Sequence, residues 1–244
     1  MKREARYKDL LDKLEIRWRD MEQEERQQEK LFFSHFAFHE RLKDLETGFF
    51  LDNYKNFHPI VSWISWKKIH LIAKYMKIFH DTRSEKILDI GCGCGFFLAE
   101  LGAGENHYGV DISRIFLKGA RRNAPWVKLF HANAKSLPFE DAFFDATVCN
   151  DVLEHVIRPD KVVKEIKRVT KPGKNRIFIS FPNEFNSRIG RMFTFRFPVM
   201  WPFHINSLDL EFLQSNLSLD ATRIISLPFD HLPWRLSMSQ IFIF

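Results

Sequence analysis

The sequence predicts an α/β fold, in which a doubly wound, mostly parallel sheet of seven strands carries an antiparallel hairpin at its C-terminal edge and a helical extension at its N-terminus. Three observations predict this fold. Short apolar runs alternate with amphipathic stretches through the middle of the chain, a Gly-rich turn follows the first run, and two further apolar runs come last. With 244 residues, of which 45% are hydrophobic, the chain is long enough to bury a large core.

The first 46 residues differ in composition from the rest. They hold 11 Lys+Arg and 12 Asp+Glu, and Leu10, Leu14 and Trp18 recur at helical spacing. Because the charges nearly cancel, a charged helix that packs on the main domain or on a second copy is favoured over an arm that binds nucleic acid. We therefore divide the chain into a helical extension or lid, residues 1–56, and a main domain, residues 57–244.

Each element of the main domain follows from a local pattern. Pro59 opens an apolar stripe of helical period, so a helix should lead into the first strand. Beyond it, apolar runs of strand length alternate with amphipathic stretches, which indicates parallel strands with helices on both faces. The predicted strands are 86–90, 107–112, 127–132, 145–149 and 176–181, and the predicted helices follow Gly95 and cover 113–123 and 159–169.

Residues 183–206 break this alternation, because they are dense in Phe, Trp and Pro. We interpret them as an insertion over the carboxyl end of the sheet. A helix at 208–214 follows. The strands at 221–227 and 236–244 are close enough in sequence to pair as an antiparallel hairpin at the sheet edge.

Composition and charge exclude several kinds of protein. The net charge of +6 is small for this length, and no Lys/Arg-rich tract contains interleaved aromatic residues, so no nucleic-acid partner is expected. The three cysteines lack metal-ligand spacing, which predicts no metal site and fits a reducing compartment. No run approaches the roughly 18 apolar residues that span a bilayer, and the N-terminus lacks a secretory signal, so a cytoplasmic protein is expected.

The Gly-rich turn is the strongest functional signal. Gly91, Gly93 and Gly95 alternate between an apolar strand and an amphipathic helix, where a tight turn lets the backbone approach a ligand closely. Asp111 ends the next strand, 20 residues after Gly91, a distance at which an acidic side chain accepts hydrogen bonds from ribose hydroxyls. Together these features predict a ligand that contains a nucleoside.

Neighbouring positions indicate which kind of nucleoside it is. The third glycine of a dinucleotide-binding turn is replaced by Phe96, and no Lys-Ser/Thr pair follows the turn as in a phosphate-binding loop. Asp89, two residues before Gly91, puts a carboxylate near the bound group. That carboxylate would repel a pyrophosphate and suits a cationic amino-acid moiety. The ligand should therefore combine a ribose with positive charge.

With these motifs the sequence resembles the class I S-adenosylmethionine-dependent methyltransferases, and within them the group of quinone and other small-molecule O-methyltransferases. The similar segments are ILDIGCGCG, GVDIS, ANAKSLPFEDAFFDATVCNDVLEHV and RVTKPGKNRIFISFPN, which lie within residues 85–183. HINSLDLEFLQSNLSL is similar, more weakly, to the helix after the family's substrate insertion. The resemblance implies a Rossmann-like fold, S-adenosyl-L-methionine as cofactor, and methyl transfer as the activity.

The resemblance also implies roles for individual residues. The turn would cradle the methionine part of the cofactor, with Asp89 oriented towards its ammonium group. Asp111 would hold the ribose, and Ile112 would flank the adenine. Asn133 stands where the family usually has Asp, and its amide can still pair with adenine. The full set of predicted cofactor residues is Asp89, Gly91, Cys92, Gly93, Gly95, Asp111, Ile112, Asn133, Ala134 and Asn150.

Catalysis should require few side chains. Methyl transfer from a sulfonium depends mainly on alignment of the reacting groups and exclusion of water. If the acceptor is a hydroxyl group, a general base has to remove its proton. His155 and His204 are the candidates, with Asp151 as a third; a structural role is an equal alternative for His155 and the favoured one for His204.

The insertion at 183–206 is the clue to the acceptor. Its Phe and Trp side chains would form an apolar lid, and its three arginines could face an anionic group, which suggests a lipid-like, aromatic or phosphorylated small-molecule acceptor. We expect methylation at oxygen, as in the O-methyltransferases that the sequence resembles. With an amine or a carbon atom as the alternative acceptor, the base would lie elsewhere or be unnecessary. Alternatively, the insertion packs on the domain, on the partner chain of a homodimer, or on a membrane surface. The competing functions are nucleic-acid or protein methylation and a non-catalytic scaffold role. For nucleic acid, the NDVL sequence after the fourth strand departs from the N/D-P-P-Y/F pattern of base methyltransferases.

Overall fold

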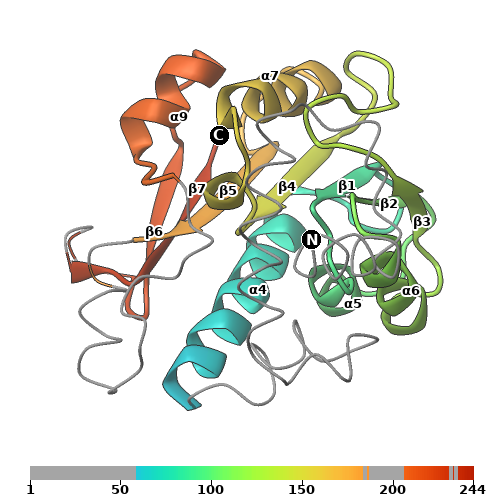
Figure 1. Cartoon of the computed structure of the whole chain (residues 1–244), viewed down its shortest axis with the longest axis horizontal. Coiled ribbons are helices and arrows are strands. Elements are labelled where there is room, and N and C mark those ends of the chain that lie inside the picture. The colour runs from blue at the N-terminus through green and yellow to red at the C-terminus, as the bar shows by residue number, and fades with distance from the viewer. Residues whose placement is uncertain (1–58, 184–185, 187–205, 231–232, 234–235) are drawn as a thin grey trace, which may run out of the picture.

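The computed structural model describes residues 59–183, 186, 206–230, 233 and 236–244 (Figure 1). The predicted extension at 1–56 and most of the insertion at 183–206, including His204, lie outside the described residues. The division of the chain at residue 56 therefore stays a prediction.

The described strands form one seven-stranded sheet in the order β3-β2-β1-β4-β5-β7-β6. Neighbouring strands from β3 to β5 are parallel, whereas β7 is antiparallel to both β5 and β6. This arrangement confirms the predicted fold class, including the antiparallel hairpin at the edge. The strands are β1 (Ile87–Ile90), β2 (His107–Asp111), β3 (Lys128–His131), β4 (Ala146–Asn150), β5 (Ile177–Pro182), β6 (Arg223–Leu227) and β7 (Ser239–Ile243).

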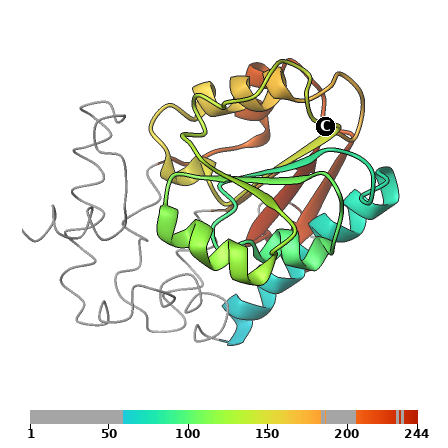
Figure 2. The same ribbon diagram turned by 90° about the vertical axis from the view of Figure 1, so that its right-hand side faces the viewer.

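Helices cover both faces of the sheet (Figure 2). One face is covered by α4, α5 and α6, and the other by α7 and α9. The short 3-10 turn η4 follows β4. The bounds are α4 (Pro59–Phe79), α5 (Phe96–Leu101), α6 (Arg114–Asn123), η4 (Leu153–His155), α7 (Pro159–Val169) and α9 (Leu210–Leu217).

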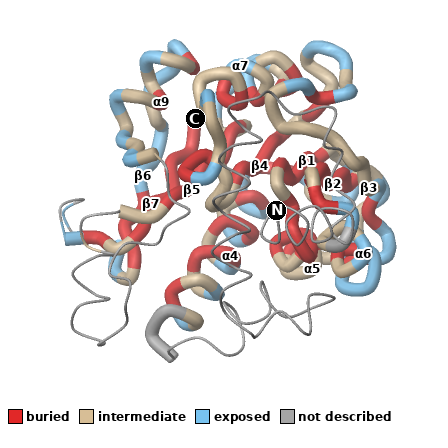
Figure 3. Tube along the Cα trace, viewed as in Figure 1, coloured by how far each residue is buried: buried red, intermediate tan, exposed pale blue. Residues whose placement is uncertain are grey.

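The core consists of two apolar clusters, one on each face of the sheet. Because side chains alternate along a strand, β1 sends Ile87 to the cluster under α4 and α5, and Leu88 and Ile90 to the cluster under α7 and α9. Figure 3 shows buried residues along the strands between the two helical layers. Burial on both faces explains why these strands read as continuous apolar runs in the sequence.

The direction of α4 places its first half beside the ligand-binding edge of the sheet. Lys68, in that half, approaches Ser239 at the start of β7, which lies next to the end of β5. His80, just after the helix, donates through Nε2 to the carbonyl of Asn175, before β5 begins, at 2.7 Å. The helix therefore runs from the carboxyl edge of the parallel strands to their amino edge, and open α/β sheets bind ligands at the carboxyl edge.

Three elements near the end of the chain have different limits from those predicted. Strand β6 begins at Arg223 rather than at residue 221. Helix α9 begins at Leu210 rather than at residue 208, because Asp209 is its N-cap and accepts the N–H of Phe212 at 2.9 Å. Strand β7 begins at Ser239 rather than at residue 236. Leu236 instead donates its N–H to the carbonyl of Pro233 in a turn, and its side chain is 63% exposed.

Candidate cofactor and acceptor site

The turn between β1 and α5 has a backbone that only glycine adopts without strain. Gly91, Gly93 and Gly95 have φ values of 72°, 51° and 75°. A Cβ on Gly91 would lie 2.3 Å from Cγ2 of Val152, and a Cβ on Gly95 would lie 3.1 Å from the backbone of Ala120. The alternating glycines noted in the sequence thus form a narrow cradle, bounded on one side by the residues after β4.

Asp111 fixes this cradle from the end of β2. One carboxylate oxygen accepts the N–H of Gly93 at 2.9 Å, and the other accepts the N–H of Ser113 at 2.8 Å. Only 8% of the residue is exposed. Asp111 therefore joins the glycine turn to the start of α6, and its carboxylate retains lone pairs with which it can accept hydrogen bonds from a ligand.

Asp89 and Asp111 form a buried pair of carboxyl groups beside the turn. Burial, and secondarily repulsion from Asp111, raises the pKa of Asp89 to about 8. Burial also raises the pKa of Asp111 to about 6, although its hydrogen bonds from the backbone N–H groups of Ser113 and Gly93 act in the opposite direction. Near pH 7 Asp89 is thus mostly protonated and Asp111 mostly ionised, and a cationic ligand would favour ionisation of both.

The residues predicted around adenine lie in the loops after β2 and β3. The carbonyl of Ile112 accepts a hydrogen bond from Nε2 of His131 at 2.8 Å, which links the two loops. The side-chain oxygen of Asn133 accepts the N–H of Lys135 at 3.0 Å. That oxygen keeps a second lone pair and the NH₂ group keeps its donors, so pairing of Asn133 with the exocyclic amine or with a ring nitrogen of adenine stays a prediction.

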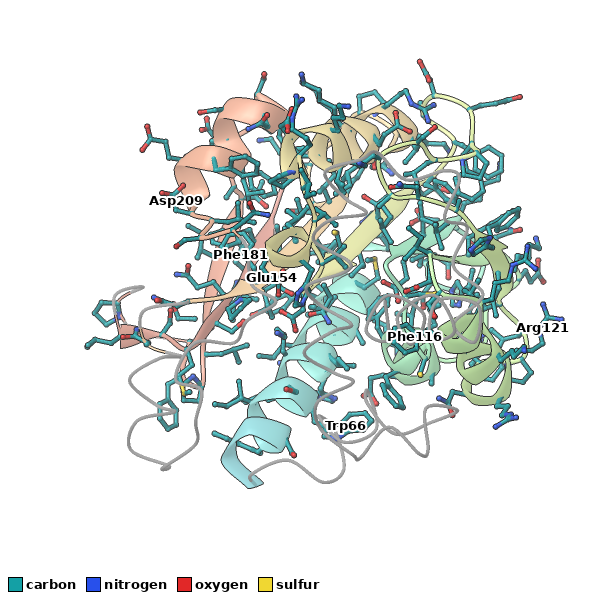
Figure 4. All side chains as sticks on the ribbon, in the orientation of Figure 1. Trp66, Phe116, Arg121, Glu154, Phe181 and Asp209 are labelled. Carbon is teal, nitrogen blue, oxygen red and sulfur yellow. The ribbon has the colours of Figure 1, made fainter. Side chains whose placement is uncertain are left out.

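The residues after β4 bring the predicted base His155 to the carboxyl edge. Its Nε2 lies 3.9 Å from a carboxylate oxygen of Glu154, and 36% of its side chain is exposed. Glu154 itself is buried, and Figure 4 labels it together with Phe181, near the end of β5. At the end of β4, Asn150 accepts the hydroxyl of Ser180 at 2.6 Å. A catalytic role for His155 stays a prediction, as does one for His204 outside the described residues.

The chain is fastened to this edge on both sides of residues 187–205. Before them, the Asn186 amide donates to the carbonyl of Ser237 at 2.7 Å. After them, the Asn206 amide donates to the carbonyls of Leu153 at 2.9 Å and Val156 at 2.6 Å. The chain after residues 187–205 is therefore anchored to the turn that carries His155, and the chain before them to the segment that leads into β7.

Lys68 is a site residue that the sequence analysis missed. It lies on α4, is 4% exposed, and forms an ion pair with Asp151, directly after β4. One signal was available, because Lys68 falls midway between Ile64 and Ile72 on the apolar stripe of the helix. A lysine on a buried face is rare unless it is paired.

The three cysteines are buried and free, as expected for small residues that fill space. Burial raises the pKa of Cys94 to about 11, and raises the pKa values of Cys92 and Cys149 well above the usual range. In the described residues no cluster of His, Cys, Asp and Glu has the arrangement of a metal site.

These thiols should resist alkylation in the folded protein, because the thiolate is the reactive form. We expect iodoacetamide at pH 7.5 to leave all three cysteines unmodified over a period that fully alkylates glutathione. In guanidinium chloride all three should react. Intact-mass spectrometry measures both outcomes, and rapid labelling of Cys94 without denaturant would contradict the burial described here.

Comparisons with known proteins agree with this geometry. Residues 88–178 match the family model described as a methyltransferase domain. Demethylmenaquinone methyltransferases from Paenarthrobacter aurescens (strain TC1) and Symbiobacterium thermophilum are 32% and 29% identical over 48% and 65% of this chain. The matched regions span only 44% and 64% of those two relatives. A solved protein of Pyrococcus horikoshii OT3 has a TM-score of 0.57 at 23% identity, covering 82% of this chain and 97% of that one.

The sheet order, the glycine cradle and the match of residues 88–178 define the class of this domain: it is a methyltransferase domain of the class I S-adenosylmethionine-dependent type, with a Rossmann-like fold. Within that class the chain is similar to methyltransferases that act on a quinone, as the names of the two relatives state.

Proposed function

We propose that the protein transfers a methyl group from S-adenosyl-L-methionine to a small-molecule, lipid-like acceptor, at an oxygen atom. The observation that carries this proposal is the cradle formed by Gly91, Gly93 and Gly95 beside the buried carboxyl groups of Asp89 and Asp111. A Cβ on Gly91 or Gly95 would strike Val152 or Ala120, so glycine lets the turn pack tightly here, and the two carboxyl groups suit a ligand with a ribose and an ammonium group. The residues present thus fit this cofactor.

The chain's own residues would divide the work of binding. Asp111 would accept hydrogen bonds from the ribose hydroxyls, and Asp89 would face the ammonium group. Ile112, Asn133 and Ala134 would surround the adenine, while Cys92 and Asn150 would border the methionine part. S-adenosylmethionine supplies a methyl group already activated on sulfur, so the protein has to orient the acceptor in line with it and exclude water.

The names of the curated relatives support an apolar acceptor. Both relatives are named for demethylmenaquinone, which is a quinone with an apolar ring system. The Phe- and Trp-rich insertion at 183–206 agrees with an acceptor of this kind. Cofactor and acceptor would meet at the carboxyl edge of the sheet, where the anchors Asn186 and Asn206 lie.

Titration calorimetry of the purified protein tests the cofactor. We expect micromolar binding of S-adenosylmethionine and S-adenosylhomocysteine and no binding of NAD, because Phe96 replaces the glycine that a dinucleotide requires. Absence of binding by either sulfur nucleoside would overturn the proposal and favour the scaffold alternative.

A lipid-like acceptor also suggests contact with a membrane surface. None of the described helices has the length and hydropathy needed to cross a bilayer. However, Trp63 on α4 is 47% exposed and Phe229 after β6 is 60% exposed, at the same edge of the sheet as the glycine cradle. The Lys67 ammonium lies over both rings, at 5.0 Å and 5.6 Å from their centroids. Aromatic rings next to a lysine are typical of surfaces that rest in the headgroup layer.

We expect the protein to float with vesicles of phosphatidylcholine and phosphatidylglycerol, and the variant Trp63→Ser/Phe229→Ser to float about fivefold less, because it loses two interfacial anchors. Trp126→Ser is the matched control, since Trp126 is 37% exposed but precedes β3, at the amino edge of the sheet. Equal flotation of all three proteins would contradict this contact. Pairing of two copies through residues 1–56 or 183–206 stays a prediction, because these segments lie largely outside the described residues.

A further inference from the structure

We propose that Asp151 receives the proton of the acceptor's hydroxyl group, that Lys68 positions Asp151 and stabilises the acceptor oxygen as it becomes negative, and that the acceptor is a phenol or hydroquinone. This inference rests on the proposed function, because it names the base and the substrate class of the same site. Its starting point is the buried ion pair between α4 and the end of β4.

Asp151 lies next to the cofactor cradle. It follows the last residue of β4, and its backbone N–H donates to the carbonyl of Ser180 at 3.0 Å, in line with β5. The next residue, Val152, is the one that a Cβ on Gly91 would strike. With φ at 53°, Asp151 also turns the chain sharply out of the strand. Its carboxylate is thereby held at the carboxyl edge, beside the turn that would carry the methyl donor.

Lys68, on α4, holds the carboxylate of Asp151 in place. Its ammonium contacts one oxygen of Asp151 and lies 3.4 Å from the hydroxyl oxygen of Ser239. The Ser239 hydroxyl donates to the carbonyl of Phe181 at 3.0 Å, so its oxygen is oriented as an acceptor. An ammonium group has three donors, and these two contacts use two of them. The third can stabilise an oxygen that becomes negative in the reaction.

The second carboxylate oxygen of Asp151, Oδ1, accepts no hydrogen bond from the described residues. It is buried, whereas 29% of the side chain as a whole is exposed. A buried carboxylate oxygen without a donor is unfavourable unless a ligand supplies one. The hydroxyl group of an acceptor is a donor of the required kind.

The identity of the base sets the class of acceptor. A carboxylate is a weak base, and an aliphatic alcohol is far too weak an acid to give up its proton to it. A phenol is a much stronger acid, with a pKa of about 10 in the case of tyrosine, and an adjacent ammonium lowers the energy of its anion further. The Lys68–Asp151 pair therefore selects an aromatic hydroxyl.

The proposed reaction is a proton transfer to Asp151 coupled to a methyl transfer from sulfur to oxygen. The acceptor's O–H bond breaks and its proton passes to Oδ1 of Asp151, which becomes a neutral carboxyl group. The acceptor oxygen forms a bond to the methyl carbon while the bond from that carbon to sulfur breaks, and its electron pair remains on sulfur. The sulfonium charge is thereby lost, the product is a neutral thioether, and Asp151 later releases the proton to water.

The test compares five variants with the wild-type protein: Asp151→Asn, Asp151→Glu, Lys68→Met, Lys68→Arg and the double variant Lys68→Met/Asp151→Asn. Asparagine tolerates the left-handed backbone at position 151, so it removes the charge without straining the chain. Lys74→Met is the matched control, because Lys74 is an exposed lysine on the same helix. The probes are 1,4-naphthohydroquinone, kept reduced with dithionite under nitrogen, and catechol, with the tritium-labelled methyl group followed into the organic phase.

We expect Asp151→Asn to lower kcat by about 100-fold or more while KM for the probe and affinity for S-adenosylhomocysteine change by less than about threefold. Lys68→Met should also lower kcat, Asp151→Glu and Lys68→Arg should retain part of it, and Lys74→Met should retain all of it. The double variant leaves no unpaired buried charge and should fold as stably as the wild type, yet it should stay inactive.

Recovery of kcat in the double variant would overturn the proposal, because it would show that the pair only tethers α4 to the sheet. Binding of S-adenosylhomocysteine without methylation of either probe would overturn the phenolic acceptor. Absence of S-adenosylhomocysteine binding would instead overturn the proposed function, so the two failures are distinguishable.

Discussion

Replacing Asp111 by Ala should lower the affinity for S-adenosylhomocysteine by about 100-fold or more. The variant loses the carboxylate that would accept two ribose hydroxyls, and a hydrogen bond to a charged group is worth roughly 1.5–3 kcal/mol. Two such bonds amount to about 3 kcal/mol, which corresponds to about 100-fold in affinity. The same change leaves the buried N–H groups of Gly93 and Ser113 without their acceptor, so the turn also loses its shape.

Calorimetric titration measures this effect, and thermal unfolding verifies that the variant is folded. Gly93→Arg should abolish binding by a different route, because it places a bulky side chain at a position with φ of 51° in the turn. Cys149→Ser is the control, since Cys149 is a fully buried residue within β4 and should leave the affinity near the wild-type value. Unchanged affinity in both Asp111→Ala and Gly93→Arg would show that the cofactor is held elsewhere.

Cofactor binding should release protons at pH 7, and the affinity should rise with pH between about 6 and 8. The pKa of Asp89 is raised to about 8 by burial and by Asp111, so this carboxyl group is mostly protonated in the free protein at pH 7. The ammonium of the ligand stabilises the carboxylate form, which lowers the pKa on binding and expels the proton. Below about pH 6, protonation of Asp111, whose burial raises its pKa to about 6, weakens binding further.

Titrations of S-adenosylhomocysteine in phosphate and in Tris measure the proton release, because the two buffers have different heats of ionisation. The variant Asp89→Asn should bind more weakly, release fewer protons and lose the rise in affinity between pH 7 and 8. It also serves as the control for protons that come from the ligand. Equal proton release by the variant and the wild type would contradict the assignment to Asp89.

The same pKa values predict an opposite trend for stability without ligand. A carboxyl group with a raised pKa binds its proton more tightly in the folded than in the unfolded chain. At Asp89 this difference contributes fully to the free energy of unfolding below about pH 4. The contribution is lost as the pH rises to about 8. The ligand-free wild type should therefore have a lower Tm at pH 8.5 than at pH 6. Asp89→Asn should remove most of this decrease and raise Tm at pH 8.5 by roughly 2–4 °C, as for a gain of about 1 kcal/mol. Differential scanning calorimetry decides the point.

Most of the fold could be predicted because its signals are local. Strands β1, β2, β4 and β5 are buried on both faces, so each appears as a short, largely apolar run between amphipathic helices, whereas the edge strand β3 is only partly buried. The three glycines of the turn also gave a local signal, because each occupies a left-handed backbone conformation that favours glycine. Asp111 lies where the pattern put it, at the last residue of β2.

The pair of Lys68 and Asp151 could not be predicted because it depends on tertiary packing. The two residues are 83 positions apart, and they meet only because α4 runs across the sheet from its carboxyl edge. Asp151 was a third candidate for the base, but neither its left-handed backbone nor its buried oxygen is visible in the sequence. The one available signal was a lysine on the apolar stripe of a helix. This signal indicates that the lysine is buried, but it does not identify the residue that pairs with it.

The hydrogen bonds of Asn186 and Asn206 that anchor the chain have a consequence for how the protein can evolve. Because both fixed points are bonded to the edge of the sheet, the residues between them can change in length or composition without displacing the glycine turn or Asp111. A new acceptor specificity could then be acquired by replacing one segment, while the part of the chain that recognises the methyl donor is inherited unchanged. Selection would act on the two halves of the reaction at different rates.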